Sequence, residues 1–214
     1  GTIIEYGLSS YHVESDLINL KASGTEWVGS PILAGGSQPI LADLPDPKSG
    51  VNMSVSARFR GHSLTETSTS HHELTLLHGS LNGDQLGSTM SWSGTASRTL
   101  SDNTPDISLD NGSNVFYITN SSTDANSSPY LDYFEIQYGR ELSFSGEYEF
   151  VSPLLGQDVR FSFSGEIPES IQLWNISDPA SPGIIPIDDS RYGNVTLSFS
   201  TLNRFVVFDI SDLN

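Results

Sequence analysis

Apolar and polar side chains alternate along most of the chain, and the alternation is broken every several residues by Gly, Pro, Asn, Asp or Ser. A spacing of two is typical of half-buried β-strands, and no stretch has the 3.6-residue periodicity of a long helix. The pattern therefore predicts an all-β protein. The predicted strands are residues 51–60, 72–78, 87–93, 114–119, 131–138, 147–151, 159–164, 171–176, 183–187, 194–200 and 203–210.

The turns and connections favour a sandwich over a meander. Asn82-Gly83-Asp84 carries a dipeptide that tolerates positive φ, so residues 72–94 are predicted to form an antiparallel hairpin. Long connections at 35–50 and 120–129 favour Greek-key or jelly-roll topology.

The strands become shorter after Arg140, which predicts a second, smaller β unit. We place the boundary near residues 143–146. The predicted domains are a jelly-roll-like antiparallel β-sandwich over residues 1–145 and a small β domain over residues 146–214.

The chain of 214 residues is strongly acidic, with 26 Asp and Glu against 9 Lys and Arg and a formal net charge of -17. This charge repels phosphate backbones and anionic lipid, so we expect no nucleic acid partner. The absence of Cys excludes thiol catalysis, disulfides and thiolate metal sites. Neither a signal peptide nor an apolar run of bilayer length is found, so we expect no membrane insertion and interpret the chain as a segment of a larger protein.

No catalytic constellation is evident. The Gly-x-Ser-x-Gly signature of a nucleophilic serine is missing, and the candidate bases are His12, His62, His71, His72 and His78. His72 and His78 lie on one face of a predicted strand, so they form either a metal pair without a third ligand or ordinary surface or edge histidines. Paired carboxylates of a glycoside hydrolase are a further alternative, because 26 acidic residues make coincidental pairs common.

Aspartates in the predicted loops are the candidate ligands of a cation. Carboxylate and carbonyl oxygens bind calcium, and a cation would offset the repulsion between acidic loops. We therefore predict a calcium site at Asp102, Asp106 and Asp110, with solvated turns capped by Asp as the alternative.

Three tryptophans and several tyrosines are candidates for packing or for binding. Trp92 and Trp174 fall within predicted strands, where burial is expected. Trp27 lies between turn residues, where it is either exposed or plugs the end of a sandwich. Exposed aromatic rings on a jelly roll bind sugars, so Trp27, Tyr130 and Tyr192 are the candidate binding residues.

Four stretches in order carry a family resemblance. They are Ser23-Gly24-Thr25-Glu26-Trp27-Val28-Gly29, residues 56–61 with His72-Glu73-Leu74, residues 131–142 and Leu173-Trp174-Asn175-Ile176-Ser177-Asp178-Pro179. Together they resemble the region that precedes the catalytic domain in gingipain-like cysteine peptidases of the PorU type, the sortase family of the type IX secretion system.

The resemblance implies a jelly-roll-like sandwich followed by an immunoglobulin-like β domain, in a secreted or cell-surface bacterial protein. It implies a downstream peptidase domain as partner and no catalytic residue within this chain. The shared positions include the structural candidates Asp132, Glu135, Arg140, Trp174 and Pro179. Arg140 is predicted to pair with Glu135, Glu141 or a loop carboxylate and to pin the sandwich to the second unit.

Two functions follow from these observations. The first is a non-catalytic accessory or scaffold segment that positions a peptidase domain or binds its partners. The alternative is a carbohydrate-binding module of a secreted bacterial protein. Calcium is the one cofactor predicted, and a stand-alone glycoside hydrolase or lyase is a third, weaker alternative.

Overall fold

A computed structural model describes residues 2–20, 26–63, 71–144, 146–154, 158–165, 167–187, 194–198 and 203–212. Apart from one short 3₁₀ helix, η1 (Ile210–Asp212), all regular structure in these residues is β-strand, which confirms the all-β prediction. None of the helical structure described there could cross a membrane.

The chain folds into two compact units. The jelly-roll unit is formed by residues 11–45 and 52–137, and the terminal unit is formed by residues 1–10, 46–51 and 138–214. The predicted domain limits, 1–145 and 146–214, stay a prediction about which parts fold independently.

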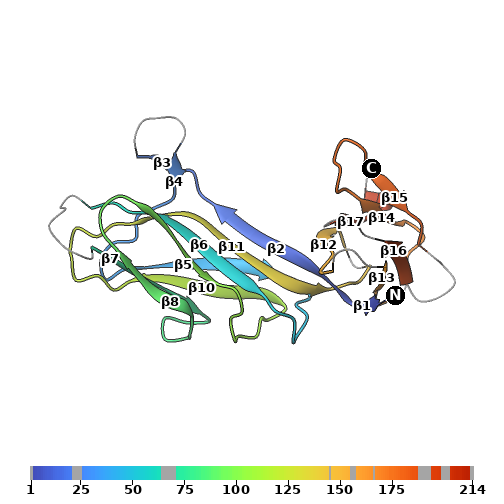
Figure 1. The fold of residues 1–214 in the computed structure, drawn as a ribbon, viewed down its shortest axis with the longest axis horizontal. Helices are drawn as coiled ribbons and strands as arrows, with labels where there is room; N and C mark the ends of the chain where they lie inside the picture. Colours follow the sequence, from blue (N-terminus) through green and yellow to red (C-terminus); the bar gives the residue numbers. More distant parts are fainter. Residues whose placement is uncertain are drawn as a thin grey trace. The chain divides into compact units, whose positions relative to one another are not determined.

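The jelly-roll unit contains a four-stranded sheet and four strands of an eight-stranded sheet (Figure 1). One sheet has the order β5 (Ser37–Leu44), β10 (Gly112–Asn120), β7 (His72–His78) and β8 (Asp84–Trp92). The other has the order β2 (Tyr6–Glu14), β11 (Tyr130–Glu141), β6 (Ser54–Arg60) and β9 (Ser97–Asp102), where β2 and β11 continue into the terminal unit.

The strand order is that of a jelly roll. If these eight strands are numbered 1 to 8 along the chain, the strand order is 2-7-4-5 in the sheet that begins with β5 and 1-8-3-6 in the strands that begin with β2. Two interleaved Greek keys produce such an order. The predicted jelly-roll-like sandwich is therefore confirmed.

Large apolar side chains fill the space between the two sheets of the jelly-roll unit. Phe116 of β10 and Phe134 of β11 are fully buried, with ring centroids 5.1 Å apart. Phe59 of β6 and Leu74 and Leu76 of β7 are fully buried as well. Full burial of such a side chain contributes about 1.5–3 kcal/mol, so this core is a main source of stability.

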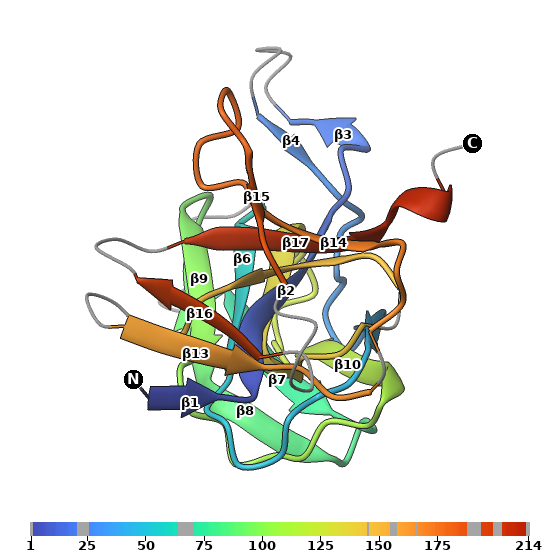
Figure 2. The ribbon, with the colours of Figure 1, turned by 90° about the vertical axis from the view of Figure 1, so that its right-hand side faces the viewer.

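The terminal unit contains a three-stranded sheet and the remaining strands of the eight-stranded sheet (Figure 2). In one sheet β1 (Thr2–Ile4) pairs in parallel with β13 (Asp158–Ser162), which pairs with β16 (Asn194–Ser198). The other has the order β15 (Gly183–Ile185), β14 (Ile171–Asn175), β17 (Arg204–Asp209), β12 (Tyr148–Val151) and the first residues of β2.

Aromatic rings join the two sheets of the terminal unit. Phe161 of β13 lies edge-on to Phe150 of β12 and Phe205 of β17, at centroid distances of 5.3 and 5.6 Å. All three rings are buried in one apolar cluster. A small two-sheet β unit thus accompanies the jelly roll, in agreement with the predicted immunoglobulin-like fold class.

The connection predicted at residues 35–50 contains the strand β5, so this part of the prediction was wrong. Pro39 interrupts the strand pattern because it cannot donate a ladder hydrogen bond. It is tolerated because β5 is an edge strand, and the buried Ile40, Ala42 and Leu44 restore the alternation. Strands β1, β2 and β9 were also not predicted, and neither were the short strands β3 (Ile18–Asn19) and β4 (Trp27–Val28).

Strands β7 and β8 form the predicted antiparallel hairpin, but the residue with positive φ in the turn differs from the predicted one. The positive φ falls on Gly79, at 82°, and not on Asn82 or Gly83. Gly83 is needed for another reason, because a Cβ there would lie 1.9 Å from the carbonyl oxygen of His78. Close backbone approach therefore explains the second glycine of this turn.

Candidate functional site

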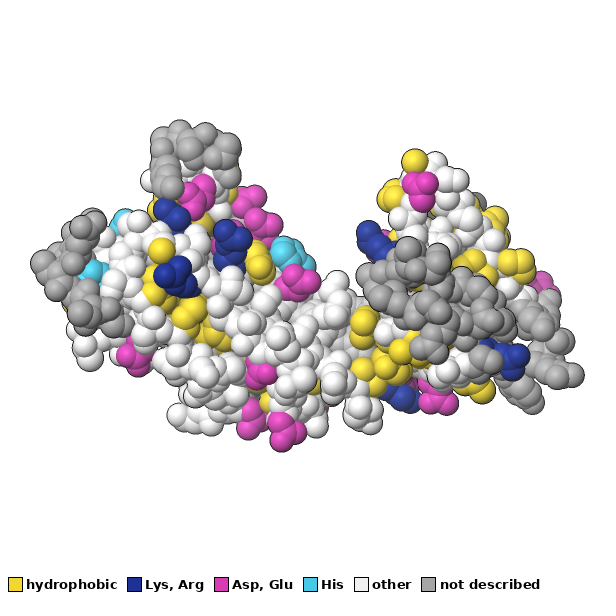
Figure 3. All heavy atoms as spheres, viewed as in Figure 1, with side chains coloured by type: hydrophobic (Ala, Val, Ile, Leu, Met, Phe, Trp, Pro, Cys, Tyr) yellow, Lys and Arg dark blue, Asp and Glu magenta, His cyan; other side chains and the backbone are white. Residues whose placement is uncertain are grey.

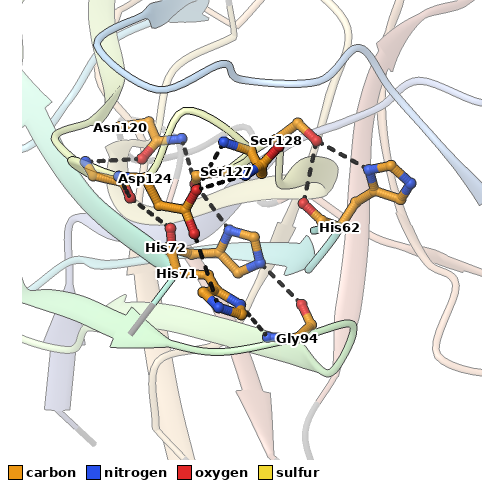
Figure 4. A network of polar contacts seen from close by, with 10 residues as sticks. His62, His71, His72, Gly94, Asn120, Asp124, Ser127 and Ser128 are labelled. Atoms are coloured by element: carbon orange, nitrogen blue, oxygen red, sulfur yellow. Dashed lines mark hydrogen bonds and ion pairs between the residues drawn. The ribbon is translucent and has the colours of Figure 1, made fainter. Parts of the chain in front are cut away.

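A buried network of polar side chains lies where β6, β8 and β10 end and β7 begins (Figure 4). His72 Nε2 lies 2.9 Å from the carbonyl oxygen of Gly94, and His72 Nδ1 lies 2.9 Å from Ser127 Oγ. Because a carbonyl only accepts, Nε2 carries the proton and Nδ1 accepts from the Ser127 hydroxyl. Asn120 Nδ2 donates to the same hydroxyl over 3.0 Å, so each group has a partner.

The neighbouring His71 extends this network to the loop after β10. The backbone N–H of Gly94 donates to His71 Nδ1, and His71 Nε2 lies 3.8 Å from Asp124 Oδ2. The Ser122 hydroxyl donates to the carbonyl of His71. Hydrogen bonds from the backbone and side chain of Asn126 lower the pKa of Asp124, so this carboxylate faces His71 in its charged form.

The distance between Ser127 Oγ and His72 Nδ1 is that of a catalytic nucleophile and its base, but the groups around the two residues differ from those of an active site. Both residues are completely buried, and burial lowers the pKa of His72. The second ring nitrogen of His72 bonds the Gly94 carbonyl, whereas an orienting carboxylate would be expected in a catalytic triad. We conclude that the network fastens the loop over residues 121–129 to the end of the sandwich.

This network was not predicted from the sequence, where His71 was only a candidate base and His72 a candidate base, metal ligand or surface or edge residue. His72 packs against the Trp92 ring at 4.6 Å, and His78 packs against Phe116 at 5.0 Å. In the described part of the chain, no three His, Asp or Glu side chains gather as a metal cluster. A usable signal was the His-His pair at the start of a strand whose partner loops are rich in Ser and Asn.

The outward face of the sheet β2-β11-β6-β9 carries a row of polar cross-strand pairs, which we call the polar lane. Its members are Arg58, Ser56 and Ser54 of β6, opposite Tyr133, Glu135 and Gln137 of β11. The intervening Phe134 and Ile136 are completely buried, so the lane faces away from the core. Figure 3 shows basic, acidic and histidine side chains gathered on the surface over these strands.

A hollow of about 260 Å³ opens on the polar lane. Its lining is Ser54, Val55, Ser56, Asn103, Glu135 and Gln137. Hydroxyl, amide and carboxylate groups thus converge there, and they offer both donors and acceptors to a ligand.

Arg60 pairs with the residue before one predicted binding aromatic and lies opposite another in the sheet. Trp27 of β4 (Trp27–Val28) is 43% exposed and follows Glu26, which pairs with Arg60 at 3.3 Å. Tyr130 lies opposite Arg60 in the sheet and edge-on to His62 at 5.5 Å. Tyr192 lies outside the described residues, and binding by all three stays a prediction.

Of the predicted structural residues, Asp132 borders the polar lane and Glu135 belongs to it. Asp132 pairs with Arg58 at 3.1 Å, and burial raises the pKa of Asp132. A β-bulge between Leu131 and Tyr133 brings Asp132 toward Arg58. Glu135 lies 3.9 Å from His12 Nδ1.

The other predicted structural residues belong to the terminal unit. Arg140 pairs with a loop carboxylate, Asp46, at 3.2 Å, and its role in pinning one unit to the other stays a prediction. Trp174 is half-buried, bonds Gln172 and packs on Phe208. Pro179 lies in an exposed turn.

The three predicted calcium ligands do not form a cluster of carboxylates. The two oxygens of Asp102 accept the backbone N–H groups of Gly87 and Thr104. Asp106 lines a hollow of about 540 Å³, and Asp110 is tied to Asn114. The Asp102 arrangement is that of a capped turn, and calcium binding stays a prediction.

An apolar hollow of about 710 Å³ lies in the terminal unit. Isoleucines and prolines dominate its lining, with Glu169 and Gln172 as the polar side chains. Ile184 at its rim is 59% exposed. The hollow suits an apolar group, but the polar side chains around it are too few to orient one.

Comparison with known proteins places this fold. Neither a family profile nor a curated protein matches the sequence. The fold is similar to part of dimeric latent PorU from Porphyromonas gingivalis, with a TM-score of 0.81 and 18% identity over 98% of this chain. This likeness shows the fold. The predicted resemblance is therefore confirmed at the level of the fold. The chain spans 21% of the PorU chain, about a fifth of its length.

Two carbohydrate-binding structures overlap more loosely. A family 35 module from Clostridium thermocellum has a TM-score of 0.31 at 17% identity, covering 60% of this chain and 90% of that chain. A tandem CBM22 domain from Paenibacillus barcinonensis also has a TM-score of 0.31, at 11% identity, covering 95% of this chain and 84% of that chain. Scores this low carry no functional argument.

Proposed function

We propose that this chain is a non-catalytic β-rich region of a larger secreted or surface gingipain-like peptidase of bacteria. In this role it positions a downstream catalytic domain or binds that protein's partners. The supporting observation is the likeness of 98% of the chain to about a fifth of PorU, at a TM-score of 0.81.

The arrangement of polar groups supports a non-catalytic role. Ser127 and His72, the one pair considered above as nucleophile and base, are sealed in the interior. A substrate carbonyl cannot reach a nucleophile that has no exposed surface. The buried pair instead stabilises the loop that it joins to β7.

The open reading frame of the parent gene provides the first test. We expect it to continue beyond residue 214 into a domain with a catalytic Cys and His. Co-expression of that domain with residues 1–214 as a separate chain should then yield a complex on size-exclusion chromatography. A reading frame without a peptidase domain, or two parts that elute separately at micromolar concentration, would contradict the proposal.

A second candidate function, sugar binding, is favoured by the hollow on the polar lane. Sugar sites combine hydroxyl and amide hydrogen bonding with an aromatic ring, and Tyr133 belongs to the same lane. Retardation of the chain in gels that contain polysaccharides tests this function directly. Equal mobility in all such gels would count against it.

A further inference from the structure

The polar lane is a continuous strip on two neighbouring strands. Its cross-strand pairs are Arg58 with Tyr133, Ser56 with Glu135, and Ser54 with Gln137. Successive pairs on one face of a sheet are about 7 Å apart, because each strand residue rises about 3.4 Å. The strip therefore offers hydrogen-bonding groups at a regular spacing along the sheet.

The hollow at the Gln137 end of the lane has the size of a subsite. Its volume of about 260 Å³ lies just below the range of about 300–1,000 Å³ that is usual for sites of small molecules. It suits one small unit of a longer ligand, with the remainder extended along the lane. Asn103, from the loop after β9, closes one side.

The chemistry of the lining excludes several ligand classes. An anion would meet the carboxylate of Glu135 within a chain of net charge -17. A divalent cation needs several carboxylates, and no group of three His, Asp or Glu is placed for a metal within the described ranges. A purely apolar ligand would leave the two serines and the two amides without partners.

A neutral sugar satisfies each of these conditions. Its hydroxyl groups both donate and accept, which matches serine hydroxyls, the Asn103 and Gln137 amides and the Glu135 carboxylate. We infer that the polar lane is the binding site of a neutral oligosaccharide, with one sugar unit in the hollow. This inference rests on the sugar-binding function proposed above.

An aromatic ring lies where the next sugar unit would fall. Tyr133 is two residues from Glu135 on β11, and its ring lies 5.5 Å from the ring of His12, which is half-exposed. Sugar rings stack on the faces of such side chains because their C–H groups are apolar. The ion pair with Asp132 holds the side chain of Arg58, which lies opposite Tyr133 in the sheet.

Affinity gel electrophoresis of the intact chain tests the inference. The probes are neutral glucans, mannans, xylans and galactans of both anomeric linkages, with alginate as an anionic comparison. We expect retardation by at least one neutral polysaccharide and none by alginate. The lane variants Gln137→Ala, Glu135→Gln and Tyr133→Ala should each weaken that binding about tenfold, equivalent to about 1.4 kcal/mol.

Gln85→Ala is the matched control, because Gln85 is an exposed glutamine on β8 of the opposite sheet. It should bind like the unmodified chain, and thermal unfolding should verify that every variant is folded. Binding that persists unchanged in all three lane variants would overturn the site while leaving sugar binding intact. A chain that no neutral polysaccharide retards would overturn both the site and the sugar-binding function.

Discussion

The guanidinium carbon of Arg140 lies 3.9 Å from the centre of the Tyr148 ring. The same guanidinium bonds Asp46 at 3.2 Å, and Arg140 keeps only 8% of its surface exposed. Asp46 has a φ of 52°, unusual for a residue other than glycine, and accepts the Glu141 N–H through its carbonyl. The ring, the cation and the strained loop residue thus stabilise one another within the terminal unit.

Arg140→Ala should lower the free energy of unfolding by about 2–4 kcal/mol. Loss of one partner of a buried pair costs about 3–5 kcal/mol, but the Asp46 side chain is 32% exposed and solvent offsets part of that. Arg140→Lys should lower the free energy of unfolding by less than Arg140→Ala does, because lysine keeps the positive charge. Some loss should remain, because lysine cannot stack a planar group on the Tyr148 ring. Urea unfolding measures both.

Arg204→Ala is the matched control for this prediction. Arg204 pairs with Glu149 in the same unit, but both side chains are about half exposed. Exposed pairs contribute only about 0–1 kcal/mol. Equal losses in Arg140→Ala and Arg204→Ala would show that burial of the Arg140 pair has no energetic consequence.

Gly7→Ala should destabilise the terminal unit. A Cβ at this position would lie 2.4 Å from Phe150 Cδ2 and 2.6 Å from Phe150 Cβ, so the whole phenylalanine would have to shift. Overpacking of this kind costs about 1–3 kcal/mol. Gly183→Ala, which meets nothing within 4 Å, should stay within about 0.5 kcal/mol of the parent chain. Similar midpoints of denaturation for the two variants would refute the packing argument.

An isolated fragment of residues 146–214 should not fold. It lacks β1, which pairs with β13, and it lacks Leu8, which pairs with Val151 of β12. It also lacks Ile4, Leu142 and Phe144, which are buried in the core of the terminal unit. We expect poor chemical-shift dispersion in its ¹⁵N spectrum, whereas the whole chain should give a dispersed one. A cooperative unfolding transition of the fragment would instead support the predicted domain limits.

Local patterns were sufficient to predict most of the strands of this fold. Residues 72–78 alternate between core and surface, and the predicted strand coincides with β7. The pattern failed at β5, where edge position made Pro39 acceptable, because edge position depends on distant pairing. It also failed at β2, which was not predicted at all, whereas the strand predicted at 131–138 lies within β11 (Tyr130–Glu141).

The site residues were harder to predict, because binding surfaces arise from pairing across strands. Glu135 was identified only as a structural residue, yet its register with Ser56 places it in the hollow. Ser54, Ser56 and Asn103 have no unusual sequence context. The burial of His72 was equally hidden, since its partners Gly94 and Ser127 lie 22 and 55 residues away.

Acid should weaken the fold through His72. Burial lowers the pKa of His72, and the charges of His71 and His62 lower it further. The hydrogen bond to the Gly94 carbonyl and the charge of Asp124 raise it, but burial is the largest effect. The unfolded chain, with an ordinary pKa of about 6.5, then binds a proton that the folded chain does not. This contribution to stability is complete above pH 6.5 and is lost as the pH falls from there toward the lower pKa of the folded state.

Urea unfolding between pH 8 and pH 5 measures this dependence. His72→Asn should be less stable at pH 8, because it loses a buried ring, but its stability should fall less steeply below pH 6.5. Asp124 affects stability in a separate pH range. Because its pKa is lowered in the folded chain, its contribution to stability is present above pH 3.8 and is lost as the pH falls below that value. An identical slope in the parent chain and in His72→Asn would exclude His72 as the acid-sensitive group.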